Sequence, residues 1–266
     1  MQISSGFGAP VFHFAVTGST MDEARRLAAE GCPEGSLVIA DWQSAGRGRT
    51  KGRRWQGEPG QSLLATLVAP RSWKDLPGLS LRVGLALALA CDDCRGGPRR
   101  EDDLEGRPDE TIGGSGFPIE LKWPNDLMAN LCKLGGVLCE STPGAILAGF
   151  GINVAQREFG GELAATATSL AMLSGGKATT SREELAEACL RRLADIEKTR
   201  DWREKIEARL WMRGRRVRIA TGLPDAGEWA EVRIVGIDAD GALLAEDREA
   251  RPLRFFSAEL GPAGTR

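Results

Sequence analysis

Residues 43–55, with the sequence QSAGRGRTKGRRW, contain the residue types that bind anions. The segment holds three glycines, four arginines and one lysine, and it has no acidic residue. Arginine presents a planar fork of donors that matches carboxylate and phosphate oxygens, and glycine lets backbone N–H groups approach a ligand closely. The composition predicts a loop that orders around an anion, although a solvated basic loop or a nucleic-acid patch has the same composition.

Further polar side chains that could bind an anion or a metal follow predicted strands or lie in loops. They are Lys122, Asn125, Asp126, Lys133 and Asn153. Ligands of α/β proteins gather at such positions. One carboxylate near an asparagine and two lysines suits Mg²⁺ and phosphate better than zinc.

Charge, hydropathy and histidine content argue against several classes of function. The chain has 266 residues and a formal net charge of −2, so the arginine cluster is local and a general nucleic-acid role is disfavoured. His13 is the single histidine and lies in an alternating run typical of a strand, which argues against a Ser-His-Asp hydrolase. No apolar run of the sequence approaches the ~18 residues of a membrane span.

The cysteines and the start of the sequence predict a cytoplasmic location. Six cysteines in a chain of this length do not resemble a disulfide framework, which favours a reducing compartment. Cys91 and Cys94 form a CxxC pair, but no second pair with zinc-site spacing accompanies them. The first residues lack a basic region followed by an apolar core, so no secretory signal is visible.

Hydrophobic periodicity predicts the strands and helices that position these side chains. Thr20 and Glu23 have capping-box spacing and predict the start of a helix that ends at Gly31. Residues 95–118 are mostly Gly, Pro and charge, which predicts a flexible surface insertion. Short strands with a hairpin signal at 240–241 predict a small barrel or sandwich after residue 213. Strands are expected at 11–16, 35–42, 61–69, 119–123, 133–141 and 144–154, and further helices at 79–90, from a cap at Ser181 to about 196, and at about 202–212.

The motifs occur in an order that resembles one known family, the biotin–protein ligases. The resemblance covers roughly residues 11 to 260, and its specificity comes from the combination of motifs rather than from any one of them. The matching motifs are SerThr at 19–20, GRGR at 46–49, GRRW at 52–55, KWPNDL at 122–127, KLGGVLCE at 133–140 and GFGIN at 149–153.

The resemblance implies an α+β fold with two domains. A mixed sheet flanked by helices, as in class II synthetases, forms the catalytic biotin- and ATP-binding domain over residues 1–212, and a small SH3-like barrel follows over 213–266. Many relatives carry an N-terminal winged helix-turn-helix that binds DNA. Here the motifs begin within 20 residues of the start, which leaves no room for that domain, so a monofunctional ligase without a DNA partner is implied.

The resemblance also implies a two-step reaction. Biotin and ATP give biotinyl-5′-AMP and pyrophosphate, and the biotinyl group then passes to a lysine of a biotin carboxyl carrier protein. Lys133, Arg47 and Arg49 take the catalytic roles, Asp126 holds Mg²⁺, and a homodimer is possible while a membrane partner is not expected. The biotin-binding set is Ser19, Thr20, Gln43, Arg47, Gly48, Arg49, Lys133, Gly135 and Gly136, and the nucleotide-binding set is Arg53, Trp55, Lys122, Asn125 and Asn153.

Two departures from the family pattern and two rival interpretations remain at this stage. Thr50 and Lys51 stand where the family has one residue, and Met21 replaces a polar residue common after SerThr. A lipoate–protein ligase would share the fold class and the adenylate chemistry. A non-catalytic nucleic-acid module could use the arginine loop and the barrel, but it has no use for Lys133 or Asp126.

Overall fold

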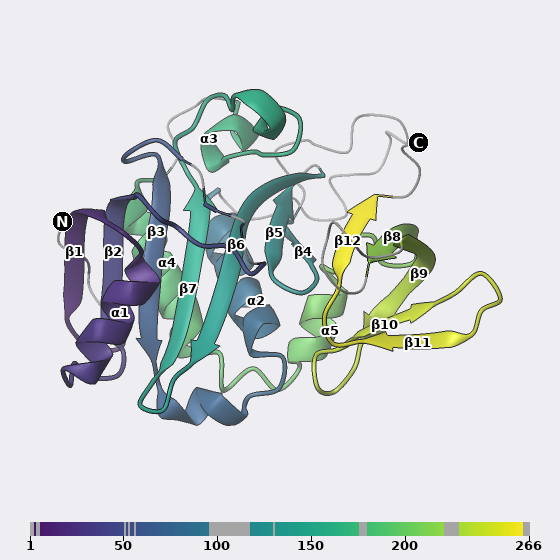
Figure 1. Cartoon of the computed structure of the whole chain (residues 1–266), viewed down its shortest axis with the longest axis horizontal. Helices are drawn as coiled ribbons and strands as arrows, with labels where there is room; N and C mark the ends of the chain where they lie inside the picture. The colour runs from purple at the N-terminus through teal and green to yellow at the C-terminus, as the bar shows by residue number, and fades with distance from the viewer. Residues whose placement is uncertain are drawn as a thin grey trace.

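The computed structural model describes residues 3, 6–50, 52, 54–55, 57–95, 118–129, 131–175, 180–220 and 229–262. A seven-stranded mixed sheet forms the centre of its larger part (Figure 1). The strands lie in the order β1-β2-β3-β7-β6-β5-β4, in which β1 and β2 are parallel and all other neighbours are antiparallel. Their bounds are β1 Val11–Thr17, β2 Leu37–Gln43, β3 Ser62–Ala69, β4 Glu120–Lys122, β5 Asp126–Ala129, β6 Cys132–Ser141 and β7 Ile146–Asn153.

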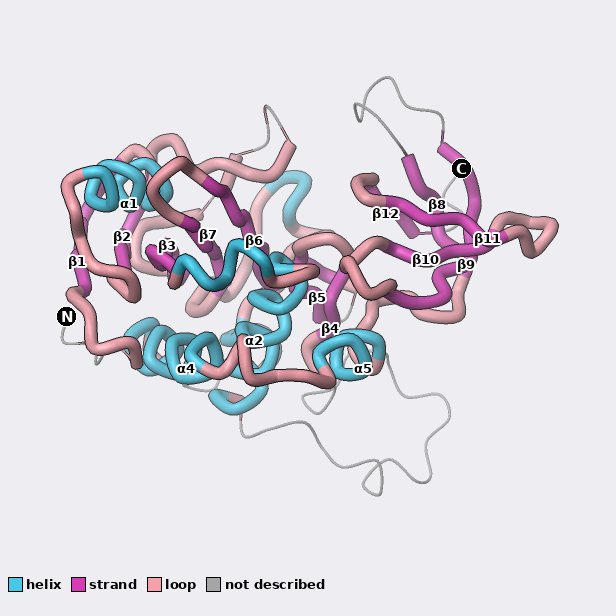
Figure 2. Tube along the Cα trace, turned by 90° about the horizontal axis from the view of Figure 1, so that it is seen from below, coloured by secondary structure: helices cyan, strands magenta, loops and turns pink. Residues whose placement is uncertain are grey.

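Helices cover both faces of this sheet, as the view from below shows (Figure 2). α1 (Thr20–Ala29) packs on one face, where Met21 and Ala24 contact the side chains of Val38, Val68 and Leu147. α2 (Leu79–Cys94) and α4 (Arg182–Ala194) pack on the other face and enclose the main core. The central strands β3 and β7 are buried along their whole length, which explains their continuous apolar sequences. Shorter elements are η1 Arg71–Asp75, η3 Gly161–Leu163, α3 Leu170–Leu173 and α5 Trp202–Glu207.

The two predicted helix starts differ in how they are capped. The Ser181 prediction is confirmed, because Ser181 and Glu184 form a reciprocal capping box at the start of α4. The capping box predicted for Thr20 and Glu23 is wrong. Glu23 accepts a hydrogen bond from Thr17 Oγ1 at 2.9 Å, and the hydroxyl and N–H of Thr20 bond to β2 instead. A tertiary partner has therefore replaced the local cap.

A second sheet of five antiparallel strands follows in the order β11-β10-β9-β8-β12 (Figure 1). The predicted turn at Gly241, with φ +87°, connects β9 and β10. The sheet fits an SH3-like domain. The sequence predicted a small barrel, but this sheet is not closed. The strands are β8 Arg216–Ala220, β9 Trp229–Ile237, β10 Leu243–Glu246, β11 Pro252–Phe255 and β12 Glu259–Pro262.

The two sheets are joined by the segment before β8. Leu121 of β4 donates its N–H to Arg209 O at 2.8 Å and accepts from Trp211 N–H at 3.0 Å. Trp123 Nε1 donates to Gly241 O of the second sheet at 3.0 Å. One hydrophobic cluster contains side chains from both sheets. The division at 212/213 stays a prediction, and packing is continuous across it.

Asp92 fixes the chain on both sides of the predicted insertion, of which residues 96–117 lie outside the described residues. Its Oδ1 accepts from Arg95 Nη2 at 3.0 Å and from the N–H of Ile119 at 3.3 Å, and its Oδ2 accepts from Arg209 Nη1 at 2.5 Å. Within the described ranges, no helix combines the length and apolarity needed to cross a bilayer.

Candidate active site

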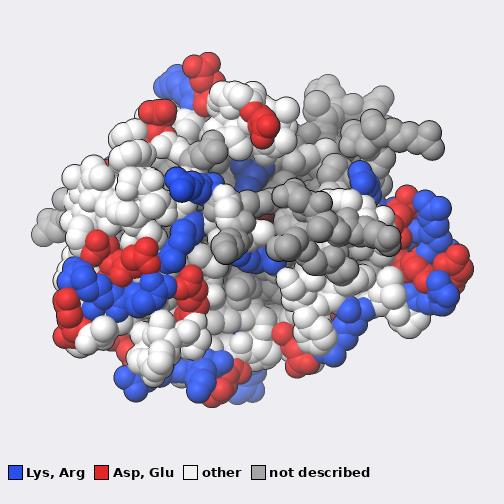
Figure 3. Space-filling model, viewed as in Figure 1, with Lys and Arg blue, Asp and Glu red and all other residues white. Residues whose placement is uncertain are grey.

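Two adjacent pockets open on the α1 side of the larger sheet, where basic side chains surround a central hollow (Figure 3). The first lies between the start of α1 and strands β3, β6 and β7, and the second between residues 47–55, the 122–126 turn and β12. Both pockets are lined by Arg47, Gly48, Arg49, Trp55, Asn125 and Lys133. A ligand with two parts could therefore occupy both pockets and place its junction at these residues.

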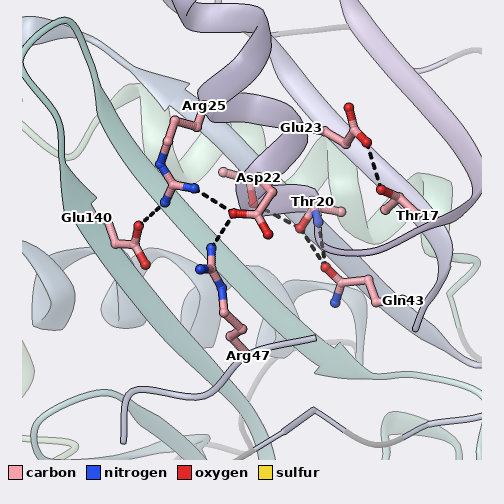
Figure 4. Close-up of polar contacts among 9 residues, drawn as sticks. Thr17, Thr20, Asp22, Glu23, Arg25, Gln43, Arg47 and Glu140 are labelled. Atoms are coloured by element: carbon pink, nitrogen blue, oxygen red, sulfur yellow. Dashed lines mark hydrogen bonds and ion pairs between the residues drawn. The ribbon is translucent and has the colours of Figure 1, made fainter. Parts of the chain in front are cut away.

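A chain of hydrogen bonds forms the polar end of the first pocket. Gln43 Oε1 accepts from the N–H of Thr20 at 2.7 Å and from Thr20 Oγ1 at 3.0 Å (Figure 4). Thr66 Oγ1 in turn donates to Thr20 Oγ1 at 2.9 Å. Ser19, Thr20 and Thr66 are almost fully buried. The hydrogen bonds thus hold the hydroxyls and the half-buried Gln43 amide in fixed positions at this end of the pocket.

Apolar side chains form the walls of the first pocket. Gly149 makes room for Met21, because a Cβ at this position would lie 2.6 Å from Met21 Cε. Gly151 makes room for the Trp55 ring in the same way, at 2.9 Å. Trp55 Nε1 is buried and has no hydrogen-bond partner within the described part of the chain, so it is an unused donor beside both pockets. The remaining apolar lining consists of Leu64, Val137, Leu138 and Phe150.

Lys133 and Asp126 form an ion pair where the two pockets meet. Lys133 Nζ lies 2.7 Å from Asp126 Oδ1. The pairing of β5 with β6 shifts register between Leu127 and Met128, and Gly136 lies opposite Asp126. A Cβ on Gly136 would lie 3.3 Å from Asp126 Oδ1 and 3.5 Å from Lys133 Nζ, so the missing side chain leaves space for the pair. The pair places a half-exposed ammonium group at the border of the pockets.

Arg47 and Arg49 contact opposite sides of the site. Arg47 Nη2 lies 2.7 Å from Asp22 Oδ1 on α1, and Arg25 binds the same oxygen at 2.6 Å and also pairs with Glu140 (Figure 4). Arg49 donates to Ser257 Oγ at 3.1 Å and to Ala258 O at 2.9 Å, next to β12. The loop therefore spans from α1 to the second sheet.

The structure brings together most of the predicted site residues. Ser19, Thr20, Gln43, Arg47, Gly48, Arg49, Lys133 and Gly136 of the predicted biotin set line the first pocket. Lys122, Trp55 and Asn125 of the nucleotide set line the second, together with Asp126. These assignments to particular ligands stay predictions.

Two predicted residues are placed differently, and a third is not described. Gly135 lines neither pocket, and a Cβ there would lie 2.6 Å from Gly151 O, so its role in the structure is close strand packing. The amide of Asn153 is buried and donates to Thr168 O at 3.0 Å, away from both pockets. Arg53 lies outside the described residues.

Several residues that line the pockets or contact their lining were not predicted from the sequence. Thr66 could have been found, because it is the one polar residue in the run LLATLVA at 63–69 and lies in a strand predicted as buried. Asp22 follows the SerThr motif by two positions, but nothing in the sequence indicates its partner across the site. The contribution of Ala258, Glu259 and Leu260 to the second pocket had no sequence signal.

The fold and site define a member of a ligase family. The sequence profile of the Biotin/lipoate A/B protein ligase family matches residues 13–157, more than half of the chain, and the chain belongs to this family. The family resemblance and the α+β fold class expected from the sequence are thereby confirmed.

Several individual proteins that this chain resembles are named ligases. The bifunctional ligase/repressor BirA of Bacillus subtilis is 30% identical over 64% of this chain, and the biotin–[acetyl-CoA-carboxylase] ligase of Mycobacterium tuberculosis is 33% identical over 67%. The matched region spans 49% of the former and 60% of the latter. A biotin protein ligase from Aquifex aeolicus, solved in complex with biotin and ATP, has a TM-score of 0.76 and 25% identity, with 96% of this chain and 99% of that chain covered.

Proposed function

We propose that this chain is a biotin–protein ligase. It activates biotin with ATP to biotinyl-5′-AMP and transfers the biotinyl group to a lysine of a biotin carboxyl carrier protein. Two adjacent pockets that share Lys133 and the arginines of the 46–49 segment support a reaction between a carboxylate and a nucleotide. The named relatives support biotin as the acid, because two of the three are biotin ligases.

The observation that carries the choice of biotin over lipoate is the polar end of the first pocket. Buried Thr20 and Thr66 and half-buried Gln43 form a hydrogen-bonded chain there. The ureido ring of biotin has two N–H donors and a carbonyl acceptor, whereas the dithiolane ring of lipoate has none. A site built for hydrogen bonds rejects a ligand that cannot make them, since its buried polar groups would lose their partners.

Lys133 is the residue that we assign to the reacting centre. Its ammonium group lies where the pockets meet, and Asp126 holds it in place at 2.7 Å. A fixed positive charge there brings the biotin carboxylate and the α-phosphate together and stabilises the charge that spreads over the phosphate in the transition state. Arg47 and Arg49 supply further donors from the loop that borders both pockets.

Magnesium is part of this proposal as a partner of the nucleotide. The described residues contain no cluster of three or more His, Cys, Asp or Glu side chains that could hold a metal ion on its own. Asp126 lines the second pocket, and one carboxylate combined with substrate phosphates is a common arrangement for Mg²⁺. When bound, the ion would screen the phosphate charge. The absence of a DNA partner, a homodimer and a cytoplasmic location stay predictions.

The proposed function is tested by following pyrophosphate release with ATP and one acid at a time. We expect release with biotin and little with lipoate, followed by labelling of a carrier domain in a second step. Release with lipoate that equals or exceeds release with biotin would overturn the choice of acid. No release with either acid, from protein with an intact melting transition, would overturn the proposed activity.

A further inference from the structure

A separate cavity lies between α2, α4 and α5. These helices lie on the face of the larger sheet opposite α1 (Figure 2). The active-site pockets are on the α1 face, so the sheet separates the two regions. The cavity contains the side chain of Arg82, which is only 7% exposed. A buried cation beside a cavity is not used by the proposed reaction and requires its own explanation.

Arg82 is incompletely paired. Its Nε donates to Pro77 O at 3.0 Å, and its Nη1 donates to Ile196 O at 3.1 Å and Thr199 O at 3.2 Å. The guanidinium carbon lies 4.5 Å from the centre of the Trp202 ring. Among the described residues, Nη2 has no hydrogen-bond partner and no carboxylate forms an ion pair with the guanidinium. Burial lowers the pKa of Arg82, as expected for a cation without a neighbouring anion.

The other charges at the cavity leave the local balance positive. Arg192, Lys205 and Asp195 line it together with Arg82, which makes three cations and one anion. Arg192 pairs with Asp93 at 2.7 Å, Lys205 with Asp201 at 3.0 Å and Asp195 with Lys198 at 2.9 Å, so each of these three charges is already partly neutralised. The uncompensated charge is therefore that of Arg82. A small anion that reached Nη2 would recover part of the free energy lost by burying the guanidinium.

The remaining wall of the cavity is apolar. Leu85 and Ala86 on α2 are buried, Leu89 one turn further is half-buried, and the Trp202 ring closes the wall from α5. Hydrated inorganic ions gain nothing from such a surface. A short hydrocarbon chain attached to the anion would gain about 0.8 kcal/mol for each buried methylene group.

We infer that this cavity binds a small monocarboxylate with a short unbranched hydrocarbon chain. The carboxylate accepts from Arg82 Nη2, and the chain lies against Leu85 and Leu89. The site is independent of the active site, and the inference stands whether or not the chain ligates biotin.

The direct test is a titration of the full chain with hexanoate, followed by the NMR signal of the Trp202 indole N–H. Comparison with a Trp202→Phe variant identifies that signal among the seven tryptophans. We expect a saturable shift with hexanoate and much weaker shifts with hexanol and with inorganic phosphate at the same concentrations. Equal responses to hexanoate and hexanol would reduce the site to an apolar groove, and an equal response to phosphate would reduce it to a cation site. Either result, or no saturable shift, would overturn the inference.

A matched pair of variants at Leu89 tests the role of charge. Leu89→Glu and Leu89→Gln introduce side chains of nearly equal size at a half-buried position, and only the first adds an anion to the wall of the cavity that contains Arg82. We expect hexanoate binding at least tenfold weaker for Leu89→Glu than for Leu89→Gln, with similar melting temperatures. Equal binding by the two variants would contradict recognition of a carboxylate by Arg82. This pair avoids changing Arg82, which also holds three backbone carbonyls.

Discussion

Asp22 on α1 holds Arg47 of the arginine loop through a contact of 2.7 Å, and the same carboxylate oxygen also binds Arg25 at 2.6 Å. Asp22 and Arg47 are 25 residues apart in sequence, and each is about half exposed. The contact fixes one arginine of the first pocket before any ligand is bound. Because Arg25 binds the same oxygen, it competes with Arg47 for Asp22.

The first prediction concerns this contact. Exposed ion pairs contribute about 0.2–1 kcal/mol, so Asp22→Asn should raise the KM for biotin by about 1.5- to 5-fold and leave kcat nearly unchanged. Hydrogen exchange in the described part of the 46–55 segment should become faster. Arg25→Gln is the matched control, since it frees Asp22 for Arg47 and should not raise the KM. Equal effects of both variants would show that Asp22 does not act through Arg47.

The second prediction concerns selectivity for the acid. Thr66→Val keeps the side-chain shape but removes the donor to Thr20 Oγ1. The loss of one hydrogen bond, about 0.5–1.5 kcal/mol, should lower kcat/KM for biotin by roughly 2- to 12-fold and leave the weak reaction with lipoate unchanged. Ser62→Ala removes a buried hydroxyl that lines neither pocket and serves as the control. A parallel loss for both acids in Thr66→Val would contradict the assignment of this end to the ureido ring.

The third prediction concerns residues 96–117. Asp92 binds both Arg95 and Ile119, so the chain on the two sides of this segment is held independently of it. Replacement of 96–117 by a Gly/Ser linker of about five residues should therefore lower the melting temperature by less than about 3 °C and preserve biotinylation. Asp92→Asn should instead destabilise the protein by about 3–5 kcal/mol, because it removes the charged partner of two arginines whose side chains are largely buried. A large loss of stability on linker replacement would show that the segment packs.

The fourth prediction concerns acid stability. Burial alone would raise the pKa of Asp41, but hydrogen bonds from His13 and Arg182 outweigh it and the pKa lies below its usual value. A carboxyl group that is more acidic in the folded state stabilises the protein above its unfolded pKa of about 3.9. This contribution is lost as pH falls through the lower folded value. The difference in melting temperature between wild type and Asp41→Asn should thus be largest above about pH 5 and shrink on acidification.

The control for the fourth prediction is Asp75→Asn, which changes an exposed carboxyl group. The difference in melting temperature between wild type and Asp75→Asn should change little between acidic and neutral pH. A pH-independent difference for Asp41→Asn would contradict the role of the His13 and Arg182 contacts.

Much of the fold follows from local patterns in the sequence. The apolar runs that became β3, β7 and α2 are unambiguous because the two strands are buried along their length and the helix over most of its length. β5 was not predicted, because Asp126–Ala129 is only four residues long and follows a turn signal directly. The start of α1 was misassigned because the cap competes with a bond from Thr20 to Gln43, which is 23 residues away. Capping rules that use only neighbouring residues cannot identify a partner so far away in the sequence.

The candidate site likewise has parts that the sequence predicts and parts that it does not. Its charged and glycine-rich motifs are visible in the sequence because anion binding requires those residue types in loops. Contacts such as Arg49 with Ser257 join residues 208 positions apart and depend on how the two sheets pack. Asn153 shows the opposite error, because its amide is used by Thr168 in a buried network rather than by a pocket.

Lys133 carries the central claim, and rapid-quench measurement of biotinyl-5′-AMP formation tests it most directly. Lys133→Ala should fold normally and lose on the order of 10² to 10³ in the rate of adenylate formation, because it removes the fixed charge between the two pockets. Lys74→Ala, a change at an exposed lysine away from both pockets, should keep the wild-type rate. Adenylate formation by Lys133→Ala within a few-fold of wild type would contradict this assignment of the reacting centre.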